Sequence, residues 1–279
     1  MKRSRRFGVK GPMLAGAALL LPTVAAAQPA PSHAERTATR ILDELRMASG
    51  VPGIGAAMTR DGRIIWTAST GYRDLERKLP VTPDTRFRFA SVSKVFAATA
   101  AARLRQEGKL DVDAPVAPML PYLKNGWPAI TSRQLAAHIS GMPHYQAVDE
   151  NRGGIRYKTA PETVALFSGR ELLSPPGTRY SYSSWGYTLL GAVVEARSGT
   201  PYLVYIARIL APGLALGPDA TGSGDPNASR AYEMRDGQPV EAPPHDHSYS
   251  WGGAGLGGTP RALAEWGGRV LRGDVVSAQ

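Results

Sequence analysis

Two short apolar segments near the N-terminus flank the dipeptide Asp61-Gly62, and they constrain the fold more than any other feature of this sequence. The segments cover residues 54–59 and 63–70. Asp-Gly readily takes the positive φ angles of a tight hairpin turn, so we expect two antiparallel strands here. A two-stranded sheet cannot bury its own faces. Either further strands are missing from this chain, or the sheet is completed elsewhere in it.

Most of the remaining chain has helical patterns, and strands followed mainly by helices indicate an α+β protein. Capping residues mark several ends: Thr131 and Gln134 form a capping-box pair, Pro260 suits a first helical position, and glycines follow the last apolar residues. The expected helices cover residues 34–48, an Ala-rich run from Ser91 to Gly108, 131–138, a segment opening at Pro161-Glu162, 187–197, 201–210 and 259–273.

The chain contains no cysteine. This excludes disulfides, thiolate metal sites and cysteine nucleophiles. Any covalent catalysis must therefore use a serine, threonine, lysine or carboxylate nucleophile.

Residues 1–27 have the pattern of a secretory signal peptide. A basic start precedes an apolar run at 13–21 and an Ala-x-Ala cleavage site at 25–27. The run is too short to span a bilayer comfortably, so we expect no membrane span in the mature protein. Residues 28–34 are predicted to be a linker and 35–279 one domain. The predicted location is the periplasm or the exterior of a bacterial cell, and general secretion is favoured over the twin-arginine route.

The net charge of +10 does not indicate a nucleic-acid partner. Five of the positive charges lie in the predicted signal peptide, before the first acidic residue at Glu35, so the remainder carries 10 − 5 = +5. No basic stripe with interleaved aromatic residues follows in the rest of the chain. The alternative, a basic arm that binds nucleic acid, is therefore not favoured.

Ser91 and Lys94 are three residues apart at the start of the Ala-rich run, so their side chains share one helix face. Lysine can serve as the base for a serine nucleophile when burial lowers its pKa. The spacing alone is a weak signal, because a helix-capping serine and a solvated lysine would look the same.

The surrounding sequence resembles the penicillin-recognising serine hydrolases: class C β-lactamases, D-alanyl-D-alanine carboxypeptidases and related esterases. The segments that carry the resemblance follow in the family's order, and they are residues 85–94, 104–113, 131–143, 176–187 and 252–273. The resemblance implies a β-lactamase/transpeptidase-like α+β fold, with an antiparallel sheet flanked by helices and a helical subdomain.

By this resemblance Ser91 is the acylated nucleophile and Lys94 accepts its proton. Tyr182 transfers a proton to the leaving group and helps to activate the deacylating water. Ser184 is expected to bind substrate, but it replaces the family's usual Asn. Because a serine has a shorter reach and only a hydroxyl, recognition of an amide is put in doubt, and a small ester is the easier substrate.

The family's His-x-Ser-Gly-x-Pro loop corresponds to residues 138–143. His138, Ser140 and Gly141 are expected to support this loop rather than to perform catalysis.

A Lys-Thr-Gly or His-Thr-Gly motif, which the family carries on a strand beside the site, has no counterpart here. The nearest string, residues 158–160, precedes Tyr182 and lacks the glycine. By resemblance the chain is truncated at its C-terminus and its C-terminal strands are missing. This leaves two functions open: an exported serine hydrolase acting on β-lactams, D-Ala-D-Ala peptides or small esters, and a non-catalytic, penicillin-binding-like scaffold or inactive fragment.

No metal or organic cofactor is expected for this chemistry. His245-Asp246-His247 has no spaced third ligand and is interpreted as a solvated loop. The glycine-rich residues 252–258 lack the strand and basic residue of a phosphate-binding loop. The expected partner is a small-molecule or peptidoglycan-derived substrate, and the sequence predicts no oligomeric state.

Overall fold

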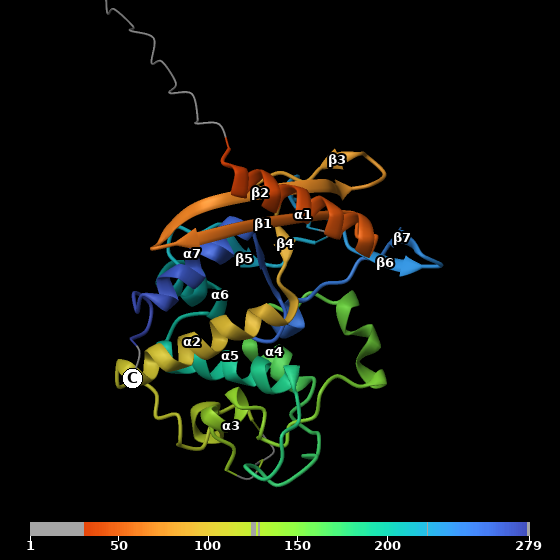
Figure 1. Ribbon diagram of the computed structural model, residues 1–279. Helices are drawn as coiled ribbons and strands as arrows, with labels where there is room; N and C mark the ends of the chain where they lie inside the picture. The colour runs from red at the N-terminus through yellow and green to blue at the C-terminus, as the bar shows by residue number, and fades with distance from the viewer. Residues whose placement is uncertain (1–30, 124–126, 128, 222, 278–279) are drawn as a thin grey trace, which may run out of the picture.

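The computed structural model describes residues 31–123, 127, 129–221 and 223–277 (Figure 1). The predicted signal peptide, residues 1–27, lies outside the described residues. Helix α1 (His33–Ser49) begins two residues inside the predicted linker, because the Ser32 side chain caps it in a capping box with Glu35.

The predicted hairpin is confirmed. Strands β1 (Gly53–Arg60) and β2 (Arg63–Asp74) pair antiparallel, and both turn residues have positive φ, 49° at Asp61 and 77° at Gly62. A third short strand, β3 (Leu79–Pro80), pairs with β2 and gives the order β1-β2-β3. Among the described residues, β1 pairs only with β2.

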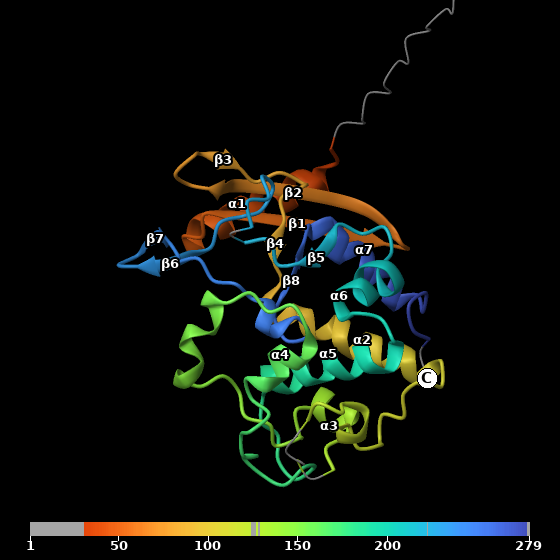
Figure 2. The same ribbon diagram turned by 180° about the vertical axis from the view of Figure 1, so that it is seen from behind.

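Helices cover both faces of this sheet. Side chains alternate between the faces of a strand, and on one face Trp66 and Thr70 bond to α1. On the other face, Gly55 and Thr59 lie against helix α7 (Pro260–Leu271). Figures 1 and 2 show α1 and α7 on opposite sides of the sheet.

Helix α1 packs loosely on the sheet and has no buried residue. Its apolar residues Ile41 and Leu45 are 45% and 56% exposed.

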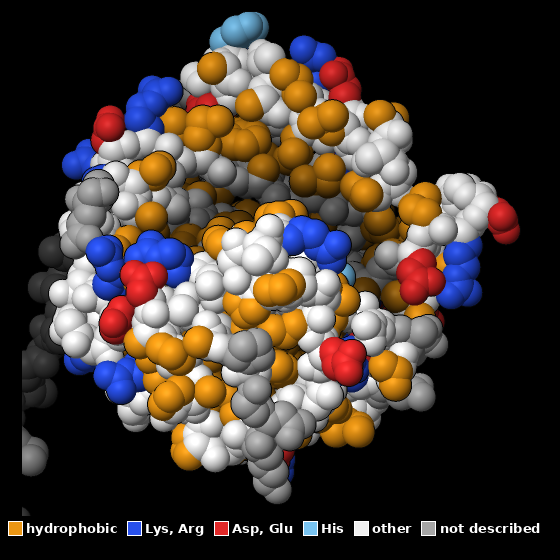
Figure 3. Space-filling view, turned by 90° about the horizontal axis from the view of Figure 1, so that it is seen from below, with side chains coloured by type: hydrophobic (Ala, Val, Ile, Leu, Met, Phe, Trp, Pro, Cys, Tyr) orange, Lys and Arg blue, Asp and Glu red, His pale blue; other side chains and the backbone are white. Residues whose placement is uncertain are grey.

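Figure 3 shows a hollow across one face of the molecule with hydrophobic side chains along its rim.

The core lies in a helical layer next to the sheet layer (Figure 2). Its centre is the packing of α2 (Ser93–Gln106) against α5 (Ser184–Ser198). Six large apolar side chains of these two helices are fully buried: Phe96, Leu104, Trp185, Leu189, Leu190 and Val193. Glycines with positive φ follow both helices, as predicted: Gly108 at 68° and Gly199 at 66°.

Smaller helices surround this pair. The capping boxes of α3 (Ser132–Ala136) and α4 (Ala160–Ala165) begin at Thr131 and Thr159. The helix predicted over 201–210 is α6 (Tyr202–Val204) continued by a π-helical segment, η4 (Tyr205–Leu210). The short 3₁₀ helices are η1 (Ala90–Val92), η2 (Ala117–Met119), η3 (Ala147–Gly154) and η5 (Ser248–Ser250).

A small sheet joins the two layers and positions the start of α2. Its strands are β4 (Phe87–Arg88), β8 (Leu256–Gly258) and β5 (Leu216–Pro218), with β8 in the middle. The Phe89 N–H donates to the Leu256 carbonyl at 2.8 Å, and the Leu256 N–H donates to Ser93 Oγ at 3.1 Å. These bonds hold the segment between β4 and α2, which carries Ser91.

A second hairpin, β6 (Tyr232–Arg235) and β7 (Gln238–Glu241), lies beside these layers. The fold is thus the expected α+β arrangement of antiparallel sheets and helices. No helix within the described ranges combines the length and the apolar character needed to cross a membrane.

Candidate active site

Ser91 lies in η1, at the turn that connects strand β4 to helix α2. The preceding residue, Ala90, has a φ of 45°, a left-handed conformation that a residue with a Cβ adopts at a cost. This turn leaves Ser91 exposed, whereas Lys94 is buried one helical turn further on. The backbone therefore presents the serine at the surface with a lysine beneath it.

The Lys94 ammonium is surrounded by three acceptors. Its Nζ lies 2.7 Å from the carbonyl oxygen of Gly253, 2.9 Å from Ser184 Oγ and 3.3 Å from Ser91 Oγ. The side chain is only 6% exposed. Burial lowers the pKa of Lys94, and Tyr182 opposes this only in part. A neutral amine next to the serine hydroxyl is thus more accessible than it would be in water.

Tyr182 closes the site from the other side. Its hydroxyl donates to Ser91 Oγ at 2.7 Å, and Lys94 Nζ lies 4.7 Å from the centre of its ring. Burial opposes ionisation of the phenol, but the hydrogen bonds and charge of Lys94 and the hydrogen bond to Ser91 outweigh it and lower the Tyr182 pKa. The phenol is therefore suited to gaining and losing a proton at the serine oxygen.

Ser184 is the first residue of α5 and is 2% exposed. The helix is capped by Ser183, whose Oγ accepts the Gly186 N–H at 2.8 Å and donates to the Pro143 carbonyl at 2.7 Å. This cap fixes the direction of the Ser184 side chain toward Lys94. Its hydroxyl oxygen serves as an acceptor for the ammonium.

The loop over residues 138–143 packs against this helix start. His138 has a φ of 58°, and its Nδ1 accepts the Ser183 N–H at 3.1 Å. Ser140 is buried, and its Oγ accepts the Met142 N–H at 3.3 Å. Gly141 has a φ of 78°, and a Cβ there would lie 2.2 Å from the Ser174 carbonyl oxygen. These contacts tie the loop to the residues that carry Tyr182 and Ser184.

Comparison with known proteins assigns the chain to a family. Residues 38–279 match the protein family described as Beta-lactamase. The chain belongs to the Beta-lactamase family. The members of this family share a serine hydrolase fold. In this chain, the side chains of Lys94 and Tyr182 both lie within hydrogen-bond distance of Ser91 Oγ.

Individual relatives agree with this assignment. The human serine beta-lactamase-like protein LACTB, a mitochondrial protein by name, is 28% identical over 84% of this chain. The octameric penicillin-binding protein homologue from Pyrococcus abyssi is 29% identical, covers 85% of the chain and superimposes with a TM-score of 0.72. EstCE1, a hydrolase with promiscuous acyltransferase activity, is 25% identical, covers 84% and also reaches 0.72. The match spans 57% and 72% of those two structures.

The β-lactamase family chain spans about half the length of the curated relatives it matches, 55% in the case of human LACTB. What the comparisons establish is the family of the chain and its fold. The fold is a β-lactamase-like serine hydrolase fold, related to that of esterases and penicillin-binding proteins.

Two parts of the site were missed by the sequence analysis. One is His144, whose Nδ1 accepts the Ser184 N–H at 3.2 Å and whose ring lies edge-on to Tyr182 with centroids 5.4 Å apart. Its position directly after the loop motif was the available signal. The other is the Gly253 carbonyl, which no side-chain pattern could reveal, although the glycine-rich run containing it had been noted.

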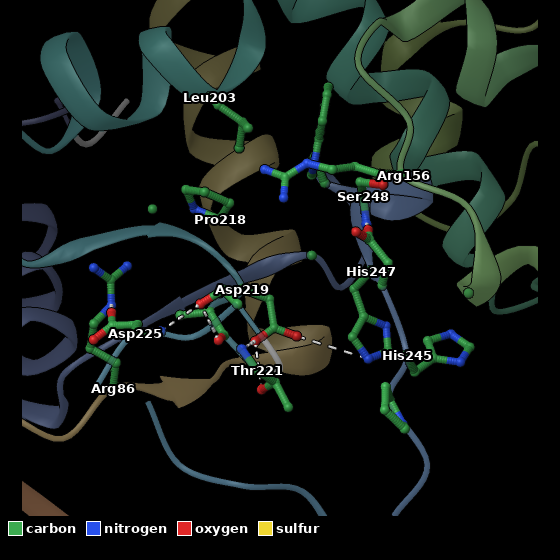
Figure 4. A pocket seen from close by; sticks show the side chains of 18 of the residues that line it. Arg86, Arg156, Leu203, Pro218, Asp219, Thr221, Asp225, His245, His247 and Ser248 are labelled. Atoms are coloured by element: carbon green, nitrogen blue, oxygen red, sulfur yellow. Dashed lines mark hydrogen bonds and ion pairs between the residues drawn. The ribbon is translucent and has the colours of Figure 1, made fainter. Parts of the chain in front are cut away.

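A cavity of about 680 Å³ lies apart from this site, and Ser91, Lys94 and Tyr182 do not line it (Figure 4). His245 and His247 line it instead. The prediction of a solvated loop is wrong for His247, because its side chain is buried. His247 is buried, and its Nδ1 lies 3.4 Å from the Tyr249 hydroxyl. Burial, helped by the charge of Arg88, lowers the pKa of His247 to about 3.

Within the described residues no group of three or more His, Asp or Glu side chains is arranged to hold a metal ion. Asp219, 3.9 Å from His247 Nε2, instead accepts two hydrogen bonds from Thr221, and burial raises the Asp219 pKa.

Proposed function

We propose that this chain is a serine hydrolase that works through an acyl-enzyme on Ser91. The observation that supports this most directly is the desolvated Lys94 amine, 3.3 Å from a serine oxygen that also accepts the Tyr182 hydroxyl. A nucleophile with a base of lowered pKa and a second proton carrier within hydrogen-bond reach is the arrangement that acyl transfer requires.

In acylation, neutral Lys94 takes the proton of Ser91 while Oγ forms a bond to the substrate carbonyl carbon. The tetrahedral intermediate collapses, and the leaving group departs with a proton delivered by Tyr182. Water then attacks the ester and loses a proton to the Tyr182 phenolate. As the bond between Ser91 Oγ and the acyl carbon breaks and the acid departs, Lys94 returns its proton to Ser91 Oγ, which restores both side chains. The three side chains that exchange protons in this cycle, Ser91, Lys94 and Tyr182, are adjacent to one another in the structure.

The backbone around Ser91 favours the negative charge that develops on the carbonyl oxygen. Ser91 lies where η1 leads into the 14-residue helix α2, at the positive end of its dipole. The Ser91 N–H is the first candidate donor to the oxyanion.

Small esters are the substrate class that we favour over β-lactams and D-Ala-D-Ala peptides. Ser184 stands at the position where an amide side chain would bind a substrate amide, and its Oγ accepts a hydrogen bond from Lys94 Nζ at 2.9 Å. Because Ser184 is buried and a serine has a shorter reach than an amide side chain, its hydroxyl is poorly placed to recognise a substrate amide. The hydrolase EstCE1, among the similar structures, is consistent with this choice.

Turnover tests the proposal. Purified protein is assayed with a chromogenic ester and a chromogenic cephalosporin, beside the variant Ser91→Ala. We expect ester hydrolysis that the substitution abolishes. Hydrolysis that survives in Ser91→Ala would overturn the assignment of Ser91 as the nucleophile, and an absence of hydrolysis in the wild type would favour a non-catalytic binding or scaffold role.

We also propose that the protein is exported to the periplasm or the cell exterior, where peptidoglycan-derived molecules are available as substrates. The support is the signal-like pattern of residues 1–27. Fractionation of cells that express the chain with a C-terminal tag, with and without residues 2–27, tests this. Equal distribution of both forms would contradict it.

A further inference from the structure

Two histidines from one loop accept hydrogen bonds from consecutive backbone N–H groups at the start of α5. His138 Nδ1 accepts the N–H of Ser183 at 3.1 Å, and His144 Nδ1 accepts the N–H of Ser184 at 3.2 Å. The first N–H groups of a helix have no partner within the helix. Here two imidazoles supply those partners and attach the loop to the helix.

The same two rings enclose the Tyr182 ring. The His138 and Tyr182 centroids are 4.6 Å apart with the planes tilted by 35°, and the His144 ring stands at 81° to the phenol at 5.4 Å. Tyr182 precedes the two bonded N–H groups directly in sequence. The imidazoles thus hold both the ring of Tyr182 and the backbone that follows it.

We propose that His144 is a positioning residue for the acyl transfer, acting together with His138 as a clamp on residues 182–184. The clamp fixes the Tyr182 hydroxyl against Ser91 and the Ser184 hydroxyl against Lys94. This inference rests on the proposed function, and it assigns His144 no contact with the reacting atoms.

The clamp requires neutral imidazoles, because a protonated Nδ1 would point its hydrogen at a backbone N–H. Burial and the Lys94 charge lower the pKa of both histidines, and His144 lowers the pKa of His138 further. His144 faces Lys94, Arg152 and Asp149, of which only Asp149 favours a charge on it. His138 faces Lys94 and His144 and is in ring contact with Tyr180, Tyr182 and Tyr187. The clamp therefore stays closed at neutral pH and opens in acid.

Two substitutions of His144 distinguish the contribution of its hydrogen-bond acceptor, Nδ1, from that of the bulk of its ring. In His144→Asn the amide oxygen stands near the position of Nδ1 and accepts the Ser184 N–H without titrating, whereas His144→Leu keeps the bulk and removes the acceptor. We expect His144→Leu to lower kcat by about tenfold to a hundredfold at neutral pH. His144→Asn is expected to retain most of the activity. The exposed His33→Leu is the control for a generic histidine loss.

The pH profile distinguishes positioning from a merely structural role. As the pH is lowered, log kcat of the wild type should fall with a slope of one where Lys94 alone gains a proton. The slope should become steeper at the lower pH where the clamp histidines also gain protons. The steepening should be weaker in His144→Asn and absent in the double variant His138→Asn/His144→Asn. An unchanged slope in both variants, or equal losses in His144→Asn and His144→Leu, would overturn the proposal.

A measurement without turnover keeps this test separate from that of the proposed function. Long-range ¹H–¹⁵N spectra of ¹⁵N-histidine-labelled protein report which ring nitrogen carries the proton. The clamp predicts the Nε2–H tautomer for His138 and His144 at pH 7, and a His144 with its proton on Nδ1 would overturn it. The wild type could show this tautomer and yet have no Ser91-dependent turnover. In that case the proposed function fails, and so does the role of His144 in acyl transfer, but the hydrogen bond between His144 and the Ser184 N–H stands.

Discussion

The phenol hydroxyl of Tyr182 donates a 2.7 Å hydrogen bond to Oγ of Ser91, which lies 91 residues earlier in the chain. Ser91 comes from the turn before α2, and Tyr182 from the segment that leads into α5. Because these helices pack against each other in the core, the distance between the two oxygens is set by rigid elements. The proposed reaction depends on this contact.

Removing the hydroxyl should therefore impair the chemistry and spare the fold. Tyr182→Phe is expected to lower kcat by about 10²–10⁴-fold, the usual contribution of a general acid or base. Tyr180→Phe is the matched control, since Tyr180 also contacts the His138 ring but is 66% exposed. Single-turnover kinetics with a chromogenic ester measure both. Equal rates in the two variants would contradict a proton-transfer role for Tyr182.

Lys94 must lose its proton to act as a base. Its pKa is lowered, so the acylation rate should rise with pH and level off below the value of an ordinary lysine, 10.5. Lys94→Arg keeps a cation that stays protonated, and we expect a loss of about 10²–10⁴-fold at every pH from 6 to 9. The exposed Lys109→Arg serves as the control. A Lys94→Arg enzyme with wild-type burst kinetics would exclude the lysine as the base.

Gly141 tests the loop that carries the clamp histidines. An alanine at φ 78° is strained, and its Cβ would also meet the Ser174 carbonyl oxygen at 2.2 Å. Gly199 has a similar φ of 66° with nothing within 4 Å of a Cβ. Gly199→Ala should reduce the free energy of unfolding by about 1–2 kcal/mol, and Gly141→Ala by more. Urea denaturation measures both, and equal losses would show that the close contact yields without cost.

Much of the fold follows from local sequence, and the exceptions have physical causes. Asp61-Gly62 lies between apolar segments and predicted its hairpin. Asp236-Gly237 has the same turn chemistry, with φ angles of 49° and 73°, but its flanking strands have only four residues each and are mostly exposed. Strands β4, β5 and β8 have two or three residues each, and long-range pairing alone creates them.

The contacts of the candidate site also fall into two groups: those that local sequence predicts and those that depend on the folded chain. The spacing of Ser91 and Lys94 predicted that their side chains could meet, and they lie 3.3 Å apart. Tyr182 and Ser184 are distant in sequence, and only the family resemblance placed them there. The His144 contact depends on how a loop meets a helix end, so no local pattern encodes it. His247 was wrongly expected to be solvated because its burial arises from packing in the folded chain.

The buried His247 should make stability depend on acid. Its folded pKa is about 3, against 6.5 for an ordinary histidine. Between these values the unfolded chain binds the proton and the folded chain does not, so the free energy of unfolding falls as the pH drops from 6.5 toward 3. In His247→Gln this fall should be smaller. Urea denaturation of wild type and variant at pH 7 and pH 4 measures it, and equal falls would contradict a neutral buried imidazole.

The central claim is that Ser91 is the residue acylated. Incubation with a β-lactam or an activated ester, followed by mass spectrometry of the tryptic peptides, measures this directly. We predict one adduct in the wild type, on Ser91, that is absent in Ser91→Ala and forms much more slowly in Lys94→Arg. An adduct that persists on another residue in Ser91→Ala, or a wild type that never becomes labelled, would contradict the mechanism.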